Sequence, residues 1–257
     1  MASHIDLTRH PITEPTYIDA CKRHLAAEGA LALNGFFRPE SIQTVVDDSL
    51  ARSNDVFYAD STHNVYLSPS DPALETSHPF NRQVASSKGL IAQDQIPTES
   101  PLREVYESSD FMAFISGVLG ITAVYPYDDS LSSINVHFAD AGRELGWHFD
   151  NSSFAVTMLL QAPKEGGRFE YVPDVRNADL DEMGFDTVTR ILDGTIRPSV
   201  LEFDPGALVL FRGRNSMHRV TPSKGPATRL LAVFAYNSEP GVRLSDSALT
   251  TFFGRTS

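Results

Sequence analysis

A histidine and an aspartate stand two positions apart in the middle of the 257-residue chain, at His148 and Asp150. In an extended chain, residues two apart point to the same side, so this imidazole and this carboxylate can bind one metal ion. The spacing alone is weak evidence, because His4 and Asp6 repeat it in a polar N-terminal segment. The strand-like run 154–161 directly after His148 and Asp150 distinguishes them from that copy.

A further histidine lies beside an apolar run in the last third of the chain. His218 comes a few residues after the run 207–211. Two histidines and one carboxylate on one side of a metal leave three positions open, which is the arrangement of non-haem Fe(II) oxygenases. We therefore predict an Fe(II) site formed by His148, Asp150 and His218.

Arg229 opens the apolar run 230–236 and shares a face with Leu231 and Val233. An arginine on the inward face of a strand needs a bound anion, because burying an unpaired charge is costly. Guanidinium groups bind carboxylates through two parallel hydrogen bonds. If 2-oxoglutarate binds the metal through its keto-acid end, with dioxygen in the third open position, we expect Arg229 to bind its distal carboxylate.

Composition excludes several other classes of protein. The chain has 21 Lys and Arg against 33 Asp and Glu, a net charge of -12 that repels nucleic-acid phosphates. The first 15 residues lack an apolar signal segment, and no apolar run is long enough to cross a bilayer. Cys21 is the only cysteine and cannot form an internal disulfide. We expect a cytoplasmic protein with no nucleic-acid or membrane partner.

The pattern of elements changes near residue 120. Helical periodicity predicts helices over 15–28, 39–50 and 101–119, a short strand over 30–37, and long loops over 55–100. Later come short apolar runs separated by turn residues, at 121–125, 131–139, 154–161, 169–172, 200–203, 207–211 and 230–236. An acidic insert over 174–194 is expected to hold a solvated helix, with a lid over the site as the weaker alternative. We predict one domain over 1–257: a helical and loop region, 1–119, packed on a β-rich sandwich or barrel, 120–240.

Three sequence stretches resemble the Fe(II)/2-oxoglutarate-dependent oxygenases, and among them the free-amino-acid halogenases and hydroxylases. They are WHFDN at 147–151, GGRFEYVP at 166–173, and LFRGRNSMHRVTP at 210–222 followed by Arg229. The resemblance covers about residues 120–240, and SHPFNR at 77–82 extends it toward the N-terminus. It implies a mostly β fold with flanking helices and a double-stranded β-helix, or jelly-roll, core.

Asp150 decides which branch of that group the chain is similar to. Halogenating members replace the metal-binding carboxylate by Gly or Ala, which opens a site for chloride. Since Asp150 is retained, the resemblance implies hydroxylation of an unactivated C–H bond of a small molecule, a free amino acid or a derivative. The cofactors would be Fe(II), 2-oxoglutarate and O2, with ascorbate as a stimulant. Lysine-halogenating relatives have an acidic residue where this chain has Asn151, which argues against lysine as the substrate.

Other residues are weaker candidates for the pocket. Asn135, on the strand before the metal motif, is expected to hydrogen-bond 2-oxoglutarate, with a structural amide as the equal alternative. Arg82 is a candidate clamp for the substrate carboxylate or else a solvated surface arginine, and Trp147 either walls the pocket or only packs. Asn151 joins them as a candidate substrate contact, while His137 is expected to be a core histidine.

The sequence leaves several alternatives open. The same cofactors could support desaturation, cyclisation or epimerisation of a natural-product intermediate. A jelly-roll metalloenzyme without 2-oxoglutarate, or a non-catalytic jelly-roll binding module, would also carry such a core. The substrate, the carbon attacked, its stereochemistry, a free or carrier-bound state, and the oligomeric state are not determined at this level.

Overall fold

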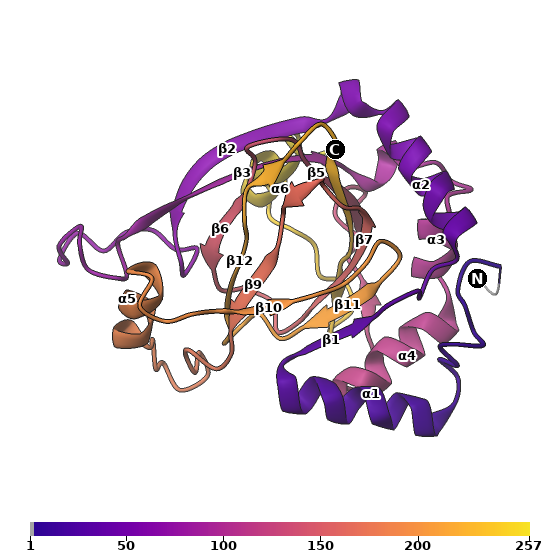
Figure 1. The fold of residues 1–257 in the computed structure, drawn as a ribbon, viewed down its shortest axis with the longest axis horizontal. Coiled ribbons are helices and arrows are strands. Elements are labelled where there is room, and N and C mark those ends of the chain that lie inside the picture. The colour runs from indigo at the N-terminus through magenta and orange to yellow at the C-terminus, as the bar shows by residue number, and fades with distance from the viewer. Residues whose placement is uncertain (1–2) are drawn as a thin grey trace.

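The structure is a computed structural model that describes residues 3–257. Four helices precede the main run of strands and pack on one side of the sheet (Figure 1). They are α1 (Pro15–Glu28), α2 (Pro39–Ala51), α3 (Pro101–Tyr106) and α4 (Ser109–Leu119). The other two helices lie elsewhere, α5 (Phe185–Leu192) in the acidic insert and α6 (Asp246–Phe253) near the C-terminus.

The strands form a nearly closed antiparallel sheet, in the order β1-β11-β7-β14-β5-β3-β6-β12-β9-β10, with β2 paired to β3. Their bounds are β1 (Ala30–Leu33), β2 (Phe57–Asn64), β3 (Gln83–Ile91), β5 (Ile134–Ala139), β6 (Leu145–His148), β7 (Ala155–Gln161), β9 (Phe169–Val172), β10 (Ser199–Leu201), β11 (Leu208–Phe211), β12 (Met217–Val220) and β14 (Arg229–Phe234). Two small ladders join β13 (Ser223–Lys224) to β8 (Glu165–Gly166) and β15 (Tyr236–Asn237) to β4 (Tyr125–Pro126). This architecture confirms the predicted fold class, mostly β with flanking helices.

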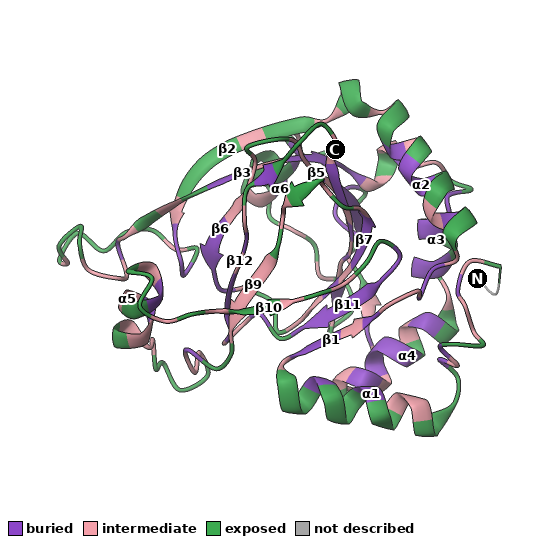
Figure 2. Cartoon of the chain, in the orientation of Figure 1, coloured by how far each residue is buried: buried purple, intermediate pink, exposed green. Residues whose placement is uncertain are grey.

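Alternation along single strands separates the core from the interior of the barrel. On β5, Ile134, Val136 and Phe138 pack in the core cluster shared with helices α1–α4. Asn135 and His137, which alternate with them, line a cavity inside the barrel. β14 and β7 alternate in the same way, and the sheet is purple, or buried, where the helices cover it in Figure 2. The period-2 pattern therefore places apolar residues outward and chemically useful residues inward.

Residues 55–100 were expected to be long loops. That expectation is wrong in part, because the segment contains the strands β2 and β3. Most of β2 is exposed, and only the end of β3 is deeply buried, so neither strand shows the apolar alternation that sequence patterns detect. β3 connects the two halves of the sheet, because it pairs with β5 through Gly89–Ile91 and with β6 through Ser86.

Other elements differ from the expected ones near helix ends. The helix expected over 101–119 is divided between α3 and α4, where the Ser108 hydroxyl accepts a hydrogen bond from the Phe111 N–H at 3.3 Å and caps α4. The strand expected over 121–125 is reduced to β4 at its end. The helix α6, beyond the expected core, is capped by Ser245 in the same manner. None of the described helices combines the length and apolar composition needed to span a membrane.

The contact between the helices and the outer face of the sheet predicts a large effect of truncating Phe114. This side chain is fully buried in α4 and stacks with Tyr17 and Phe36. We expect Phe114→Ala to lower the free energy of unfolding by about 3–5 kcal/mol, since it removes a buried ring and leaves a cavity. Chemical denaturation measures the change, with Leu180→Ala as control because Leu180 is 68% exposed. Equal midpoints for the two variants would contradict the packing described here.

Candidate metal centre

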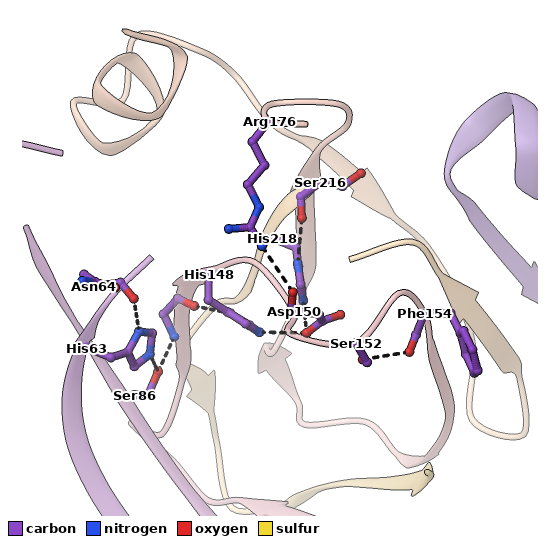
Figure 3. A network of polar contacts seen from close by, with 11 residues as sticks. His63, Asn64, Ser86, His148, Asp150, Ser152, Phe154, Arg176, Ser216 and His218 are labelled. Carbon is purple, nitrogen blue, oxygen red and sulfur yellow. Dashed lines mark hydrogen bonds and ion pairs between the residues drawn. The ribbon is translucent and has the colours of Figure 1, made fainter. Parts of the chain in front are cut away.

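Three potential metal ligands lie on neighbouring parts of the sheet and face one another. His148 is the last residue of β6, Asp150 follows in the next loop, and His218 in β12 is the direct antiparallel partner of His148. Figure 3 shows the two imidazoles turned toward the carboxylate. Within residues 3–257, these three form the one group of histidine and acidic side chains positioned to share a metal ion.

The distances between the ligand atoms suit a single ion. Nε2 of His148 lies 3.7 Å from Oδ1 of Asp150, and Nε2 of His218 lies 3.5 Å from the same oxygen. The two imidazole centroids are 4.1 Å apart. Because metal–nitrogen and metal–oxygen bonds are about 2.1 Å long, two ligands at right angles are about 3 Å apart. The space enclosed by these three side chains therefore has the size of one coordinated ion.

Backbone carbonyls determine which nitrogen of each imidazole faces this space. Nδ1 of His148 donates to the carbonyl of Gly146 at 2.8 Å, and Nδ1 of His218 donates to that of Ser216 at 3.0 Å. A carbonyl only accepts, so the proton is on Nδ1 and the lone pair of Nε2 is free. Burial, followed by the neighbouring His218, lowers the pKa of His148 to about 3. That ring is therefore neutral, which is the form that binds a metal.

Asp150 is held as a carboxylate with one oxygen lacking a partner. Burial acts to raise its pKa, but His218 and His148 outweigh burial and lower it. Its Oδ2 is buried and accepts no hydrogen bond from the described residues 3–257. A buried carboxylate oxygen without a donor needs another positive partner. This orphaned oxygen, together with two free imidazole nitrogens, fits a divalent cation of the Fe(II) type.

Two loops meet at Asp150 and leave no room for a side chain at Gly213. The Asp150 N–H donates to the Gly213 carbonyl at 3.0 Å, and a Cβ on Gly213 would overlap Oδ2 of Asp150. Arg176 fastens the same loops, since its Nε donates to the Arg214 carbonyl at 2.7 Å and its Nη2 to the Asp150 carbonyl at 3.4 Å. Its guanidinium also stacks on Phe149, 4.2 Å from the ring centroid. The backbone thus positions the carboxylate from both sides.

A chain of hydrogen bonds extends from β2 to His148 (Figure 3). The Ser86 hydroxyl accepts from the Gly146 N–H at 2.9 Å and bonds Nε2 of His63 at 2.7 Å. The Gly146 carbonyl in turn accepts from His148. The polar residues of β2 and β3 therefore help to orient a metal ligand on β6.

The triad opens into a cavity of about 300 Å³ that also contains Arg229. Arg229 is only 5% exposed, and its guanidinium hydrogen-bonds to none of the residues 3–257. Burial lowers its pKa to about 10. Asn135 lines the same cavity with its Oδ1 unpartnered. His137 faces the cavity rather than the core, and burial, Lys88 and Arg229 lower its pKa well below the ordinary value.

Comparison with known proteins places the chain in a family. The family model described as Halogenase D matches residues 14–251, most of the chain. The chain belongs to the Halogenase D family. No curated protein matches this Halogenase D member.

Solved structures similar to this chain are 2-oxoglutarate–Fe(II) oxygenases. A 2OG-Fe(II) family oxidoreductase from Burkholderia pseudomallei aligns with a TM-score of 0.54 and 14% identity, covering 88% of this chain and 93% of that one. A prolyl-4-hydroxylase from Pseudomonas putida gives 0.51 and 13%, covering 84% and 96%. The epimerase SnoN from nogalamycin biosynthesis, solved with Fe3+ and alpha ketoglutarate, gives 0.55 and 11%, covering 87% and 84%. At these identities the likeness concerns the fold, and it confirms the predicted jelly-roll core.

Three expected pocket residues of this Halogenase D member lie away from the cavity. Trp147 alternates with His148 along β6 and therefore points outward, where it lines a separate cavity of about 670 Å³ next to α5. Arg82 lines that outer cavity too, and its Nη1 donates to Asp193 at 2.6 Å. Asn151 is exposed, and only its carbonyl takes part in a contact, with Arg214 at 3.3 Å. The structure thus does not bring these side chains to the triad, contrary to expectation.

Other residues around the site were not expected from the sequence. Lys88 projects into the cavity from β3, and Phe252 and Phe253 of α6 line it. The signal for α6 was present, as a serine cap at Ser245 and a glycine stop at Gly254. No such signal exists for Lys88, because it becomes an inward residue only through the pairing of β3 with β5.

The contact between Gly213 and Asp150 predicts a selective loss of metal affinity. We expect Gly213→Ala to weaken Fe(II) binding about tenfold or more, since the new methyl group pushes the carboxylate off its position. Anaerobic Fe(II) titration followed by calorimetry measures the effect. Ser70→Ala is the control, because Ser70 lies at an exposed loop position away from the site. Equal Fe(II) affinity in both variants would mean that Asp150 does not bind the ion.

Proposed function

We propose that this member of the Halogenase D family is an Fe(II)- and 2-oxoglutarate-dependent dioxygenase that hydroxylates an unactivated C–H bond of a small molecule, a free amino acid or a close derivative. The observation that carries the proposal is the convergence of two Nε2 atoms and Oδ1 of Asp150 on a single point inside the barrel. The bound iron, with 2-oxoglutarate and dioxygen, supplies the oxidising power for the reaction.

The chain supplies the geometry for that chemistry. His148, Asp150 and His218 would hold Fe(II), and all three line the cavity. Arg229, buried and unpaired in the same cavity, binds the distal carboxylate of 2-oxoglutarate through two hydrogen bonds. Asn135 contributes its side-chain amide to the wall of this cavity. Apolar side chains of β14 and β11 exclude water from the remaining space, namely Leu231, Val233, Val209 and Phe211.

Asp150 supports hydroxylation rather than halogenation, although the family name refers to halogenases. A halogenating relative lacks this carboxylate and uses the position for chloride, as the sequence resemblance implies. Here the carboxylate occupies that position and extends to the backbone of Gly213, so the place that chloride takes in such relatives is filled. Chlorinated product from the unaltered protein would overturn this part of the proposal.

The remaining expectations are part of the same proposal. We propose a single domain over 1–257 acting in a reducing, cytoplasmic setting, which agrees with one buried cysteine, Cys21. Its partner would be a small molecule, with neither nucleic acid nor membrane involved, and ascorbate would stimulate turnover.

The proposed iron site predicts a spectroscopic signature. Anaerobic addition of Fe(II) and 2-oxoglutarate should produce a weak metal-to-ligand charge-transfer band in the visible. His148→Ala and His218→Ala should abolish it, because each removes one of the two imidazole ligands. The double variant His4→Ala/Asp6→Ala is the matched control: it removes the other His-x-Asp pair, whose His4 contacts Ser41 and Glu104 instead. A protein that never develops the band is not an oxygenase of this class.

The role of Arg229 predicts a change in cosubstrate affinity. We expect Arg229→Met to raise the concentration of 2-oxoglutarate needed for half of the band by about 10- to 100-fold, since a charge-assisted pair contributes about 1.5–3 kcal/mol. Arg229→Lys should lie between this variant and the unaltered protein. Arg168→Met, at an exposed arginine, should leave the value unchanged. An unaltered requirement in Arg229→Met would mean that the cosubstrate carboxylate binds elsewhere.

A further inference from the structure

The cavity contains a second cation that the iron and cosubstrate sites leave unused. Lys88 lines the cavity together with Arg229 and the triad. Among residues 3–257, no hydrogen-bond or ion-pair partner holds its ammonium group. Its one close contact is the ring of Phe252, whose centroid lies 5.3 Å from Nζ. A positive charge in a cavity whose one carboxylate, Asp150, is a metal ligand is available to bind an anion.

Strand register separates Lys88 from Arg229. β3 pairs with β5 through Gly89 and Phe138, so Lys88 lies level with Ala139 on one side of β5. Arg229 is the partner of Ala139 on the other side, in β14. The two backbones are therefore two strand spacings apart, about 10 Å. Their charges act on His137 from these two sides.

Lys88 lines the same cavity as the metal centre. Burial lowers the pKa of Lys88 to about 8, and Asp150 acts in the opposite direction. Asp150 is also the only carboxylate of the described chain that lines this cavity. Once a metal takes Asp150, two cations remain for ligands from solution.

2-Oxoglutarate accounts for one of these cations only. Its keto-acid end belongs to the metal and its distal carboxylate to Arg229, so it has no third anionic group for Lys88. The outer arginine expected to clamp the substrate, Arg82, is paired with Asp193 outside the cavity. Lys88 is therefore the available partner for a second anionic ligand.

We propose that Lys88 binds a carboxylate of the substrate and holds the molecule beside the metal, under α6. The inference rests on the proposed function and deepens it, because it defines the substrate class as carboxylic acids. A free amino acid meets this requirement through its α-carboxylate, whereas an amide, an ester or a carrier-bound thioester does not. Phe252 and Phe253 form the apolar wall against which the rest of the substrate packs.

The test uses the holoprotein with Fe(II) and 2-oxoglutarate in four forms: unaltered, Lys88→Met, Lys88→Arg and the control Lys22→Met, which removes an exposed lysine of α1. The probes are the twenty free amino acids and their carboxamides. Two readouts are followed, the perturbation of the charge-transfer band under anaerobic conditions and succinate release in air.

Four results are expected. At least one acid responds in the unaltered protein, about tenfold or more tightly than its own carboxamide. Lys88→Met removes this preference and weakens the acid about tenfold or more, Lys88→Arg retains it, and Lys22→Met changes nothing. The 2-oxoglutarate requirement of Lys88→Met stays within about twofold of normal, in contrast to Arg229→Met. Lys88→Met should melt no lower than the unaltered protein, since it removes an unpaired buried charge.

Any of three outcomes overturns the proposal. A raised 2-oxoglutarate requirement in Lys88→Met would assign Lys88 to the cosubstrate. Equal responses to acid and carboxamide would remove the carboxylate from recognition. A normal band with no response to any acid would exclude free amino acids as the substrate class. In all three cases the band itself still forms, whereas failure of the proposed function abolishes the band in the unaltered protein.

Discussion

The direct pairing of His148 with His218 across β6 and β12 is the constraint on which the site depends. These neighbouring strands bring two imidazoles together from positions seventy residues apart in the sequence. A carbonyl two residues before each histidine accepts a hydrogen bond from its Nδ1–H, which leaves both Nε2 atoms facing the metal position. Asp150 needs only one further turn of the chain to join them. The sheet thus builds the metal centre from backbone geometry, with little reliance on flexible loops.

The same strands of the sheet contribute both to the hydrophobic core and to the cavity that contains the candidate site. On β5 and β14, residues that pack against the helices alternate with residues that line the cavity. A shift of one residue in the β5–β14 register would bury Arg229 in the helical core and expose Phe138 to the cavity. The large apolar face beneath α1–α4 opposes such a shift, because every core side chain would be displaced. Arg229 and His137 are therefore positioned by the burial of their neighbours.

How far the sequence predicts this structure depends on whether the signal is local. Two-residue spacing and adjacent apolar runs were enough to select the four residues His148, Asp150, His218 and Arg229, which the structure does bring into one cavity. The same alternation implies that Trp147 points outward if His148 points inward. The expectation that Trp147 forms a wall of the pocket did not take this alternation into account. β6 and β12 are only four residues long, too short for a periodic pattern. The position of Lys88 depends on the pairing of β3 with both β5 and β6, which is a long-range contact that no local sequence pattern encodes.

The eight-residue strand β2 pairs only with β3, so its other edge presents free backbone donors and acceptors. Such an edge can recruit a strand from another molecule and start aggregation. Its central residues, Asp60 to His63, are polar or charged, and Asp60 is engaged by Arg143 at 2.8 Å. Intermolecular pairing would have to desolvate these groups, which protects the protein at high concentration. Replacing Asp60 to His63 with β-branched apolar residues would create an aggregation-prone edge strand without altering the barrel interior.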